Sequence, residues 1–234
     1  RDVLGSRGLG DVYKRQGKDL EERFIGNAYM FTPEERKKLL KIKTNAPDPT
    51  EITKPFYDKV KNKDDVTKMQ YLDLHMWMTG DILLKADKMS MANSLELRVP
   101  FLDKEVMAVA EKIPRRYRVT HKEQTDADTK YITKYAMRLA AKKDTPPQTA
   151  KTAAKKKLGF PVPIRVWLKE DKYYNIVKSS FTGNAANKFF NTDMIVKLLD
   201  DHKNGKADNS RKIWTIYTFL VWYNVYFENS EFVK

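Results

Sequence analysis

Helix-start signals recur along most of this chain, whereas the period-two alternation of half-buried strands is scarce. Thr32 is followed by Pro33 and by Glu35, the residue types of an N-cap, a first helical position and a capping box. They predict a helix through about Lys41. A longer helical stretch is predicted from about Asp64, with apolar residues at three- and four-residue steps. The chain is therefore predicted to be mostly α, with helices packed around an aromatic core.

Prolines and glycines set the expected boundaries. Residues 45–55 hold three prolines and are expected to form a connector. The long helix is expected to break near Gly80 and to resume as far as Met91. Residues 97–100 are expected to be extended, because a residue that precedes proline avoids the helical region. Gly205 is expected to close a helix with a left-handed cap.

Two later helices are also predicted. Asp103 is expected to cap one that carries Val106 and Val109 inward. The last helix is expected to begin at Ser210, and residues 213–226 are apolar nearly all round. A helix without a polar face is typical of a protein interior, so a buried central helix is predicted there.

Composition excludes several classes of protein. The chain of 234 residues has no cysteine, which excludes disulfides, zinc–thiolate sites, iron–sulfur clusters and cysteine nucleophiles. Its three histidines do not lie at ligand spacing from one another, so no metal site is predicted. No apolar run approaches the roughly 18 residues of a membrane span, and the start does not read as a signal peptide. We expect a soluble, cytoplasmic protein with no membrane contact.

The charge balance is strongly basic. Lysine and arginine number 45 against 31 aspartates and glutamates, a formal net charge of +14. This balance is typical of proteins with polyanionic partners, but a lysine excess spread along the chain equally fits a solvated surface. A freestanding basic helical protein that binds nucleic acid therefore stays open as an alternative, although no nucleic-acid motif supports it.

Residues 1–16 differ in composition from the rest. Four of the nine glycines lie in the first 17 residues, without helical or strand periodicity. The stretch lacks the Lys-Ser/Thr of a phosphate-binding loop and resembles translated sequencing adapter. We expect 1–16 to be a non-native leading segment, with an ordinary flexible terminus as the alternative, and 17–234 to be the native domain.

The segment from Asp81 to Asp103 sets charged residues among apolar ones that are expected to be buried. Burying a charge costs several kcal/mol unless it is paired. The charges should therefore pair with one another or meet a ligand, and both readings stay open. They are Lys85, Asp87, Lys88, Glu96, Arg98 and Asp103.

A second segment runs from Lys155 to Pro163 and reads Lys-Lys-Lys-Leu-Gly-Phe-Pro-Val-Pro. A turn of this composition can hold a lysine on a rigid loop as a point charge for phosphate. The alternative is a solvated surface run. The lysine concerned is Lys155, Lys156 or Lys157.

Both segments resemble one known family. The runs Lys-Ala-Asp-Lys-Met-Ser-Met-Ala and Ser-Leu-Glu-Leu-Arg-Val-Pro-Phe-Leu-Asp are similar to the C-terminal part of the glutamine-hydrolysing asparagine synthetases. Lys-Lys-Leu-Gly-Phe-Pro-Val-Pro-Ile-Arg-Val-Trp-Leu follows in the same order, and so do His-Lys-Asn-Gly-Lys-Ala-Asp and Ser-Arg-Lys-Ile-Trp-Thr. The resemblance covers about residues 17–227.

The resemblance implies a ligase of amino-acid biosynthesis that uses ATP and Mg²⁺. The family adenylates the side-chain carboxylate of aspartate and releases pyrophosphate. Ammonia, supplied from glutamine by a separate glutaminase domain, then attacks the acyl-adenylate to give asparagine and AMP. By resemblance Lys157 is the active-site lysine, and Glu96 is a base or an orienting group near the reacting centre. Lys88, Asp87 and Arg98 match further positions, and the resemblance implies that they bind substrate or hold the loop together.

Parts of the family pattern are missing from this chain. They are the nucleophilic cysteine, the Ser-Gly-Gly-x-Asp-Ser loop that binds ATP pyrophosphate, and the Ser-Gly-Glu-Gly-x-Asp-Glu loop. We therefore expect the helical C-terminal portion of an αβ ATP-pyrophosphatase-type (adenine nucleotide alpha hydrolase-like) synthetase domain whose parallel sheet is missing. Such a fragment should be inactive alone and should bind neither ATP nor a metal through its own motifs.

The expected partners are the glutaminase domain and the nucleotide-binding half of the same protein, with aspartate and ammonia or glutamine as substrates. A homodimer stays open. Relatives within the wider family amidate other carboxylates or close β-lactam rings, and either reaction is an alternative for the parent enzyme.

Overall fold

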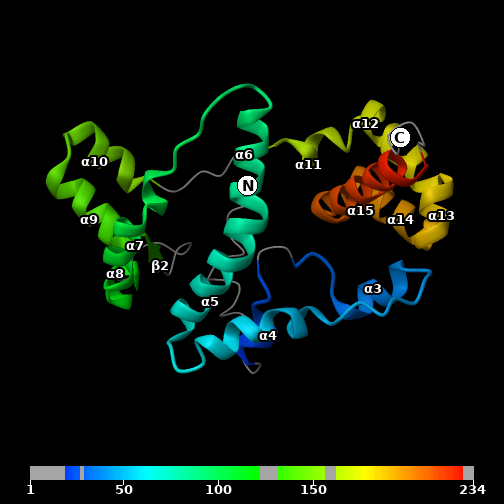
Figure 1. Cartoon of the computed structure of the whole chain (residues 1–234). Helices are drawn as coiled ribbons and strands as arrows, with labels where there is room; N and C mark the ends of the chain where they lie inside the picture. The colour runs from blue at the N-terminus through cyan, green and yellow to red at the C-terminus, as the bar shows by residue number, and fades with distance from the viewer. Residues whose placement is uncertain (1–18, 27–28, 122–130, 156–161, 229–234) are drawn as a thin grey trace. The chain divides into compact units, whose positions relative to one another are not determined.

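The computed structural model describes residues 19–26, 29–121, 131–155 and 162–228 (Figure 1). The leading segment 1–16, Lys156 and Lys157 lie outside the described residues. Helices dominate, as predicted. The chain divides into two compact units, which are taken separately below. Of the described residues, the first unit holds 19–26 and 47–155 and the second holds 29–46 and 162–228.

The first unit is a series of helices with one small hairpin. Its elements are α2 (Leu20–Arg23), α4 (Pro49–Lys59), α5 (Asp65–Asp73), the π-helix η1 (Leu74–Leu83), α6 (Leu84–Met91), the 3₁₀ turn η2 (Pro100–Leu102), α7 (Lys104–Glu111), α8 (Arg115–Arg118), β1 (Val119–His121), β2 (Tyr131–Thr133), α9 (Tyr135–Asp144) and α10 (Pro147–Ala154).

The long helix begins at about the predicted position but does not break where expected. The Asp64 carboxylate accepts a hydrogen bond from the Thr67 amide at 3.2 Å. From there α5, η1 and α6 continue without interruption, visible as one rod in Figure 1. Gly80 lies inside this rod, so the predicted break is wrong. A glycine weakens a helix by about 1 kcal/mol relative to alanine, a cost that favourable neighbours can offset.

The predicted connector over 45–55 is also wrong in part, because α4 begins at Pro49. Asp48 caps it by accepting from the Thr50 amide at 3.0 Å, and proline suits the first helical position, where no N–H is needed. Pro55 lies inside the helix. Pro49, one of the three prolines expected to interrupt helical structure, thus begins a helix.

The core of the first unit is small. Leu20, Phe24, Tyr57, Met69 and Leu72 cluster at the junction of α2, α4 and α5. The Tyr57 hydroxyl donates to the Phe24 carbonyl at 2.5 Å. Beyond Leu72 the unit has no interior: among its described residues from 73 to 155, none is buried. Val106 and Val109, expected to point inward, are 41% and 65% exposed.

A two-stranded antiparallel hairpin pairs β1 with β2, with Thr120 opposite Ile132. Tyr131 lies in β2, and α9 begins at Tyr135. The strands were missed because each has only three residues, too few to show alternation.

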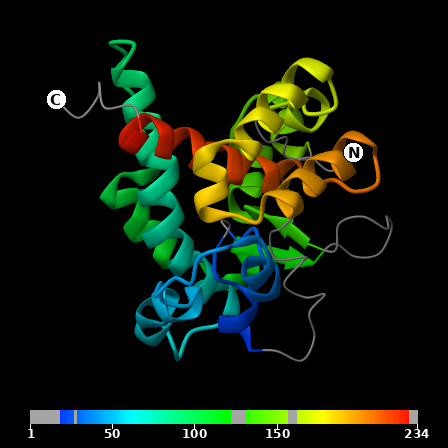
Figure 2. The same cartoon turned by 90° about the vertical axis from the view of Figure 1, so that its right-hand side faces the viewer.

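The second unit has a closed hydrophobic core. Its elements are α3 (Pro33–Leu39), α11 (Ile164–Trp167), α12 (Asp171–Thr182), α13 (Asn184–Phe189), α14 (Thr192–Lys203), α15 (Ser210–Tyr223) and the π-turn η3 (Asn224–Glu228). The capping box at Thr32 and Glu35 is present as predicted. Phe181, Ile195, Leu199, Ile213 and Leu220 are fully buried between α12, α14 and α15, which lie together in Figure 2.

The last helix is amphipathic, not buried all round. Ile213, Ile216 and Leu220 face the core, whereas Trp214 and Trp222 are each 45% exposed. The prediction of a buried central helix is therefore wrong for the described residues. No helix in the described part of the chain is long and apolar enough to cross a membrane.

Candidate functional site

The first candidate segment leaves α6 through a tight turn. Ser94 has φ of +54°, a left-handed conformation that a serine adopts at a cost of roughly 1–2 kcal/mol. The Ser94 amide donates to the Met91 carbonyl at 3.0 Å, and the Leu95 amide donates to the Ser90 carbonyl at 2.9 Å. These two bonds form a Schellman motif, the usual end of a helix. Ser94 thus sets the direction in which the following residues leave the helix.

Residues 95–99 follow without helical structure, and η2 begins at Pro100. The Arg98 guanidinium pairs with the Glu96 carboxylate at 2.5 Å. Leu95, Leu97 and Val99 are 60%, 49% and 43% exposed. Charged and apolar side chains therefore alternate along the segment, as in a strand with one apolar face.

The charges of this segment are not buried. Glu96 and Arg98 side chains are 70% and 83% exposed, and Asp87 and Lys88 are exposed. The expectation of charges held in an apolar interior is wrong for the described residues, because the apolar side chains around them have no surface to pack on. Among the described residues, the side chains of Asp87 and Lys88 form no hydrogen bond or ion pair with Glu96 or Arg98.

Local pairing accounts for the charges at the two ends of the segment. Lys85 pairs with Asp81 at 3.0 Å, and the Trp77 indole donates to Asp81 at 2.8 Å. Partial burial raises the pKa of Asp81, but the hydrogen bonds from Lys85 and Trp77 outweigh it and hold that pKa below its usual value. Asp103 caps α7 by accepting from the Glu105 amide at 2.8 Å. Asp81, Lys85 and Asp103 therefore stabilise the local backbone at the two ends of the segment.

The second candidate segment is fixed at its start by Arg138. Lys155, the last residue described before the gap, is the C-cap of α10. Its carbonyl accepts a hydrogen bond from Arg138 at 3.2 Å. Lys157 lies outside the described residues, so its relation to Glu96 stays a prediction. Arg138 was missed by sequence reasoning because its contacts join separate elements, which no local pattern reports.

The motif that runs from His202 to Ser210 connects several helices of the second unit. His202 is 1% exposed. Its Nε2 lies 2.9 Å from the Arg165 carbonyl, and its Nδ1 accepts from the Asn209 amide at 3.2 Å. Asp208 accepts from the Ser210 hydroxyl at 2.7 Å. The motif thereby ties α11, which follows the lysine segment, to α14 and α15.

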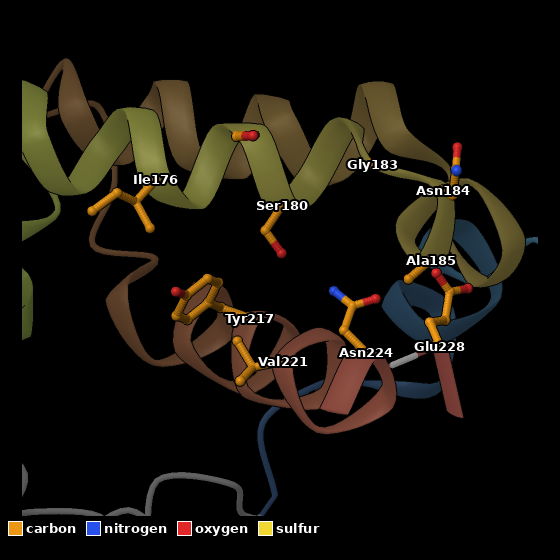
Figure 3. Close-up of a pocket in the computed structure, with 10 residues that line it drawn as sticks. Ile176, Ser180, Gly183, Asn184, Ala185, Tyr217, Val221, Asn224 and Glu228 are labelled. Carbon is orange, nitrogen blue, oxygen red and sulfur yellow. The ribbon is translucent and has the colours of Figure 1, made fainter. Parts of the chain in front are cut away.

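An open cavity of about 430 Å³ lies in the second unit between α12, α13, α15 and η3. Figure 3 shows Ser180 on α12 facing Asn224 on η3, with Tyr217 and Glu228 nearby. None of Asp87, Lys88, Glu96 or Arg98 lines it. Its position therefore gives no reason to connect it with the candidate residues.

Metal ligands do not gather in the part of the chain that the structure describes. No group of three histidine, aspartate or glutamate side chains there could hold an ion. No residue of this part is therefore assigned to a metal.

Comparison with known families matches residues 6–224 to the family described as asparagine synthase. The curated relative asparagine synthetase (glutamine-hydrolyzing) 1 of Bacillus subtilis (strain 168) is 44% identical over 227 residues, which cover 96% of this chain and 33% of that protein. A putative asparagine synthetase (glutamine-hydrolyzing) of Mycobacterium tuberculosis (strain ATCC 25618 / H37Rv) is 38% identical over 226 residues, covering 97% of this chain and 33% of that protein. No solved structure gives a significant match.

The chain thus spans about a third of the length of the curated relatives it matches. The family match begins at residue 6, inside the leading segment. The non-native origin of residues 1–16 stays a prediction.

Proposed function

The chain belongs to the asparagine synthase family, and on that premise we propose that it is the helical C-terminal part of a glutamine-hydrolysing asparagine synthetase. The parent enzyme makes asparagine from aspartate and ammonia through a β-aspartyl-AMP intermediate, with ammonia released from glutamine in a separate domain. The observation that carries this proposal is a family match extending over residues 6–224. The native part of the chain is taken as 17–234.

The remaining two thirds of the parent protein supply a parallel αβ sheet of the ATP-pyrophosphatase type, the nucleotide site and the glutaminase domain. Support comes from the first unit, where the described residues from 73 to 155 include none that is buried. Between residues 82 and 109 the exposed large apolar side chains are Ile82, Leu84, Met89, Met91, Leu95, Leu97, Val99, Phe101, Leu102, Val106 and Val109. We call this set the docking face. An apolar surface of this kind marks a contact with another protein surface, and the missing two thirds of the same protein are its proposed occupant.

Docking also gives Glu96 its orientation. In an extended segment, burial of one face fixes which way the other face points. With Leu97 and Val99 held against the missing part of the protein, Glu96 and Arg98 point together toward the opposite side. The guanidinium of Arg98, 2.5 Å from the Glu96 carboxylate, then holds that carboxylate in one direction.

The proposed reaction assigns two roles. Lys157 neutralises phosphate charge as pyrophosphate leaves and stabilises the oxyanion that forms when ammonia adds to the acyl carbon. Glu96 accepts a proton from the attacking nitrogen or orients it, and AMP departs as the C–O bond breaks. Asp87 and Lys88 are proposed to bind substrate.

ATP and Mg²⁺ belong to the parent enzyme, where they supply the adenylating group and offset its charge. Because the described residues hold no cluster of metal ligands, no step in this chain is assigned through the ion.

The test is an assay of the full-length protein with aspartate, ammonia, ATP and Mg²⁺, measuring asparagine and AMP. Equal amounts of the two products are expected, and the 234-residue chain alone should form neither. Separate alanine substitutions of Lys155, Lys156 and Lys157 identify the lysine. Lys157→Ala should lower kcat by about 100- to 1000-fold, the cost of removing one preorganised donor. A full-length protein that binds ATP but forms no asparagine would refute the proposed function.

A further inference from the structure

Positive charge is concentrated on one part of the first unit. The described residues from Arg115 to Lys155 form α8, the hairpin, α9 and α10, and they hold nine lysines and arginines and one acidic residue, Asp144. The other described residues of the chain hold 26 lysines and arginines against 24 aspartates and glutamates. The net charge of the described residues therefore lies mostly on α8–α10, and is not spread evenly along the chain.

Most of these cations have no opposite charge beside them. Arg115 and Arg118 approach the Asp64 carboxylate at 3.9 and 3.6 Å, and Arg138 donates to the Lys155 carbonyl at 3.2 Å. The other six cations are exposed, and their side chains form no ion pair with another described residue. We call these six the basic surface, and they are Arg116, Lys134, Lys142, Lys143, Lys151 and Lys155.

The elements that carry the basic surface are short and adjoin one another. The rings of Tyr117 on α8 and Tyr135 on α9 stack with their centres 6.5 Å apart and an angle of 7° between their planes. α9 packs on α10, beside which it lies in Figure 1. With ten residues, α9 is about 15 Å long, which is about two Debye lengths at physiological salt. Positive charges this close together repel one another and attract a polyanion.

An exposed aromatic ring lies among these charges. Tyr117 is 40% exposed, and the Arg116 guanidinium carbon lies 5.1 Å from the centre of its ring. Cations beside an exposed ring are typical of proteins that bind single-stranded nucleic acid, because the cations contact phosphates and a base stacks on the ring. We propose that the basic surface binds single-stranded nucleic acid, with Tyr117 stacking on a base. This activity is additional to the proposed synthetase function and does not depend on it.

The apolar side chains of this region favour nucleic acid over a lipid surface. A helix that lies on a membrane buries a wide apolar face among the lipids. Among the described residues of α8–α10, the large apolar side chains that are exposed are Tyr117, Met137 and Leu139, and α10 exposes none. The cations of α10 therefore have no apolar face beside them to enter a bilayer.

The charge test measures binding of a fluorescent single-stranded RNA of about 20 nucleotides, long enough for one binding site, to the full-length protein by anisotropy. The logarithm of the binding constant should fall with the logarithm of salt concentration with a slope of about −3 to −4, from about 0.7 per phosphate contact. Lys142→Glu/Lys143→Glu should weaken binding at least about tenfold and make the slope shallower by about 1 to 2. The matched control is Lys61→Glu/Lys63→Glu, which reverses two exposed lysines of the same unit and should change affinity less than about threefold.

The stacking test separates bases from charge. Tyr117→Ala should weaken RNA binding about 5- to 30-fold, the loss of one stacked base. Its affinity for heparin, a polyanion without bases, should change less than about twofold, which also shows that the variant is folded. Tyr117→Phe keeps the ring and should bind RNA as the wild type does.

Three results would overturn the inference. They are no RNA binding by the full-length protein at about 0.15 M salt, an equal loss of affinity in Lys61→Glu/Lys63→Glu and Lys142→Glu/Lys143→Glu, and unchanged RNA binding by Tyr117→Ala. Phosphatidylserine vesicles are the competing probe, and binding to them as tight as to RNA would assign the surface to a membrane instead. None of these measurements needs asparagine formation, so failure of this inference and failure of the proposed function are distinguishable.

Discussion

Phe101 lies on the docking face and is 69% exposed. Burying a phenylalanine side chain completely stabilises by about 1.5–3 kcal/mol. About two thirds of that, or about 1–2 kcal/mol, is still to be gained when the missing part of the protein covers Phe101. Phe101→Ala should therefore weaken assembly of the chain with that missing part, raising their dissociation constant about 5- to 30-fold. The same substitution should change the stability of the 234-residue chain by less than about 0.5 kcal/mol, because it removes a side chain that is mostly in water.

Leu199→Ala is the matched control for Phe101→Ala, and its expected effects on stability and assembly are reversed. Leu199 is fully buried in the second unit, and removing a buried leucine side chain costs about 2–5 kcal/mol. The Leu199→Ala variant should lower the urea midpoint of the chain and leave the affinity of the folded chain for the N-terminal part of the protein unchanged. The assay is a titration of the chain with the separately produced N-terminal part, followed by calorimetry, beside urea unfolding of the chain. The reasoning is refuted if Phe101→Ala destabilises the isolated chain by 2 kcal/mol or more, or leaves assembly unaffected.

Two further predictions concern stability in the first unit. Tyr57→Phe removes the hydroxyl that donates to the Phe24 carbonyl at 2.5 Å and should cost about 1–2 kcal/mol in urea unfolding; an unchanged midpoint would mean that water replaces the bond. Partial burial raises the pKa of Asp64, but hydrogen bonds from Thr67 and the charges of Arg118 and Arg115 outweigh it and lower that pKa. The carboxylate therefore stabilises the fold above its unfolded pKa of about 3.9, and this stability is lost as the pH falls through the lower, folded pKa. Unfolding of Asp64→Asn between pH 3 and 7 should show a flatter acid arm than the wild type, and identical pH profiles would contradict this.

Local signals predicted several of the helix ends. Thr32 and Glu35 form the expected capping box, Asp64 and Asp103 cap the helices that follow them, and Gly205 takes the expected left-handed conformation, with φ of +73°. Each of these outcomes is decided by residues within a few positions along the chain.

Burial could not be predicted in the same way. Val109 on α7 and Trp222 on α15 belong to apolar patterns that indicate a core, yet both are exposed. A pattern reports that a face will be covered, but the covering surface can lie in another part of a longer protein. The same limit applies to the candidate site. Glu96 was found through its motif, but its ion pair with Arg98 and the anchor at Arg138 depend on tertiary geometry.

Reconstitution tests the central claim most directly. The 234-residue chain and the separately produced N-terminal part of the parent protein are assayed alone and mixed, with aspartate, ammonia, ATP and Mg²⁺. Neither part alone should form asparagine, and the mixture should form asparagine and AMP in equal amounts. Asparagine formation by the chain alone, or a mixture that assembles but stays inactive, would contradict the account.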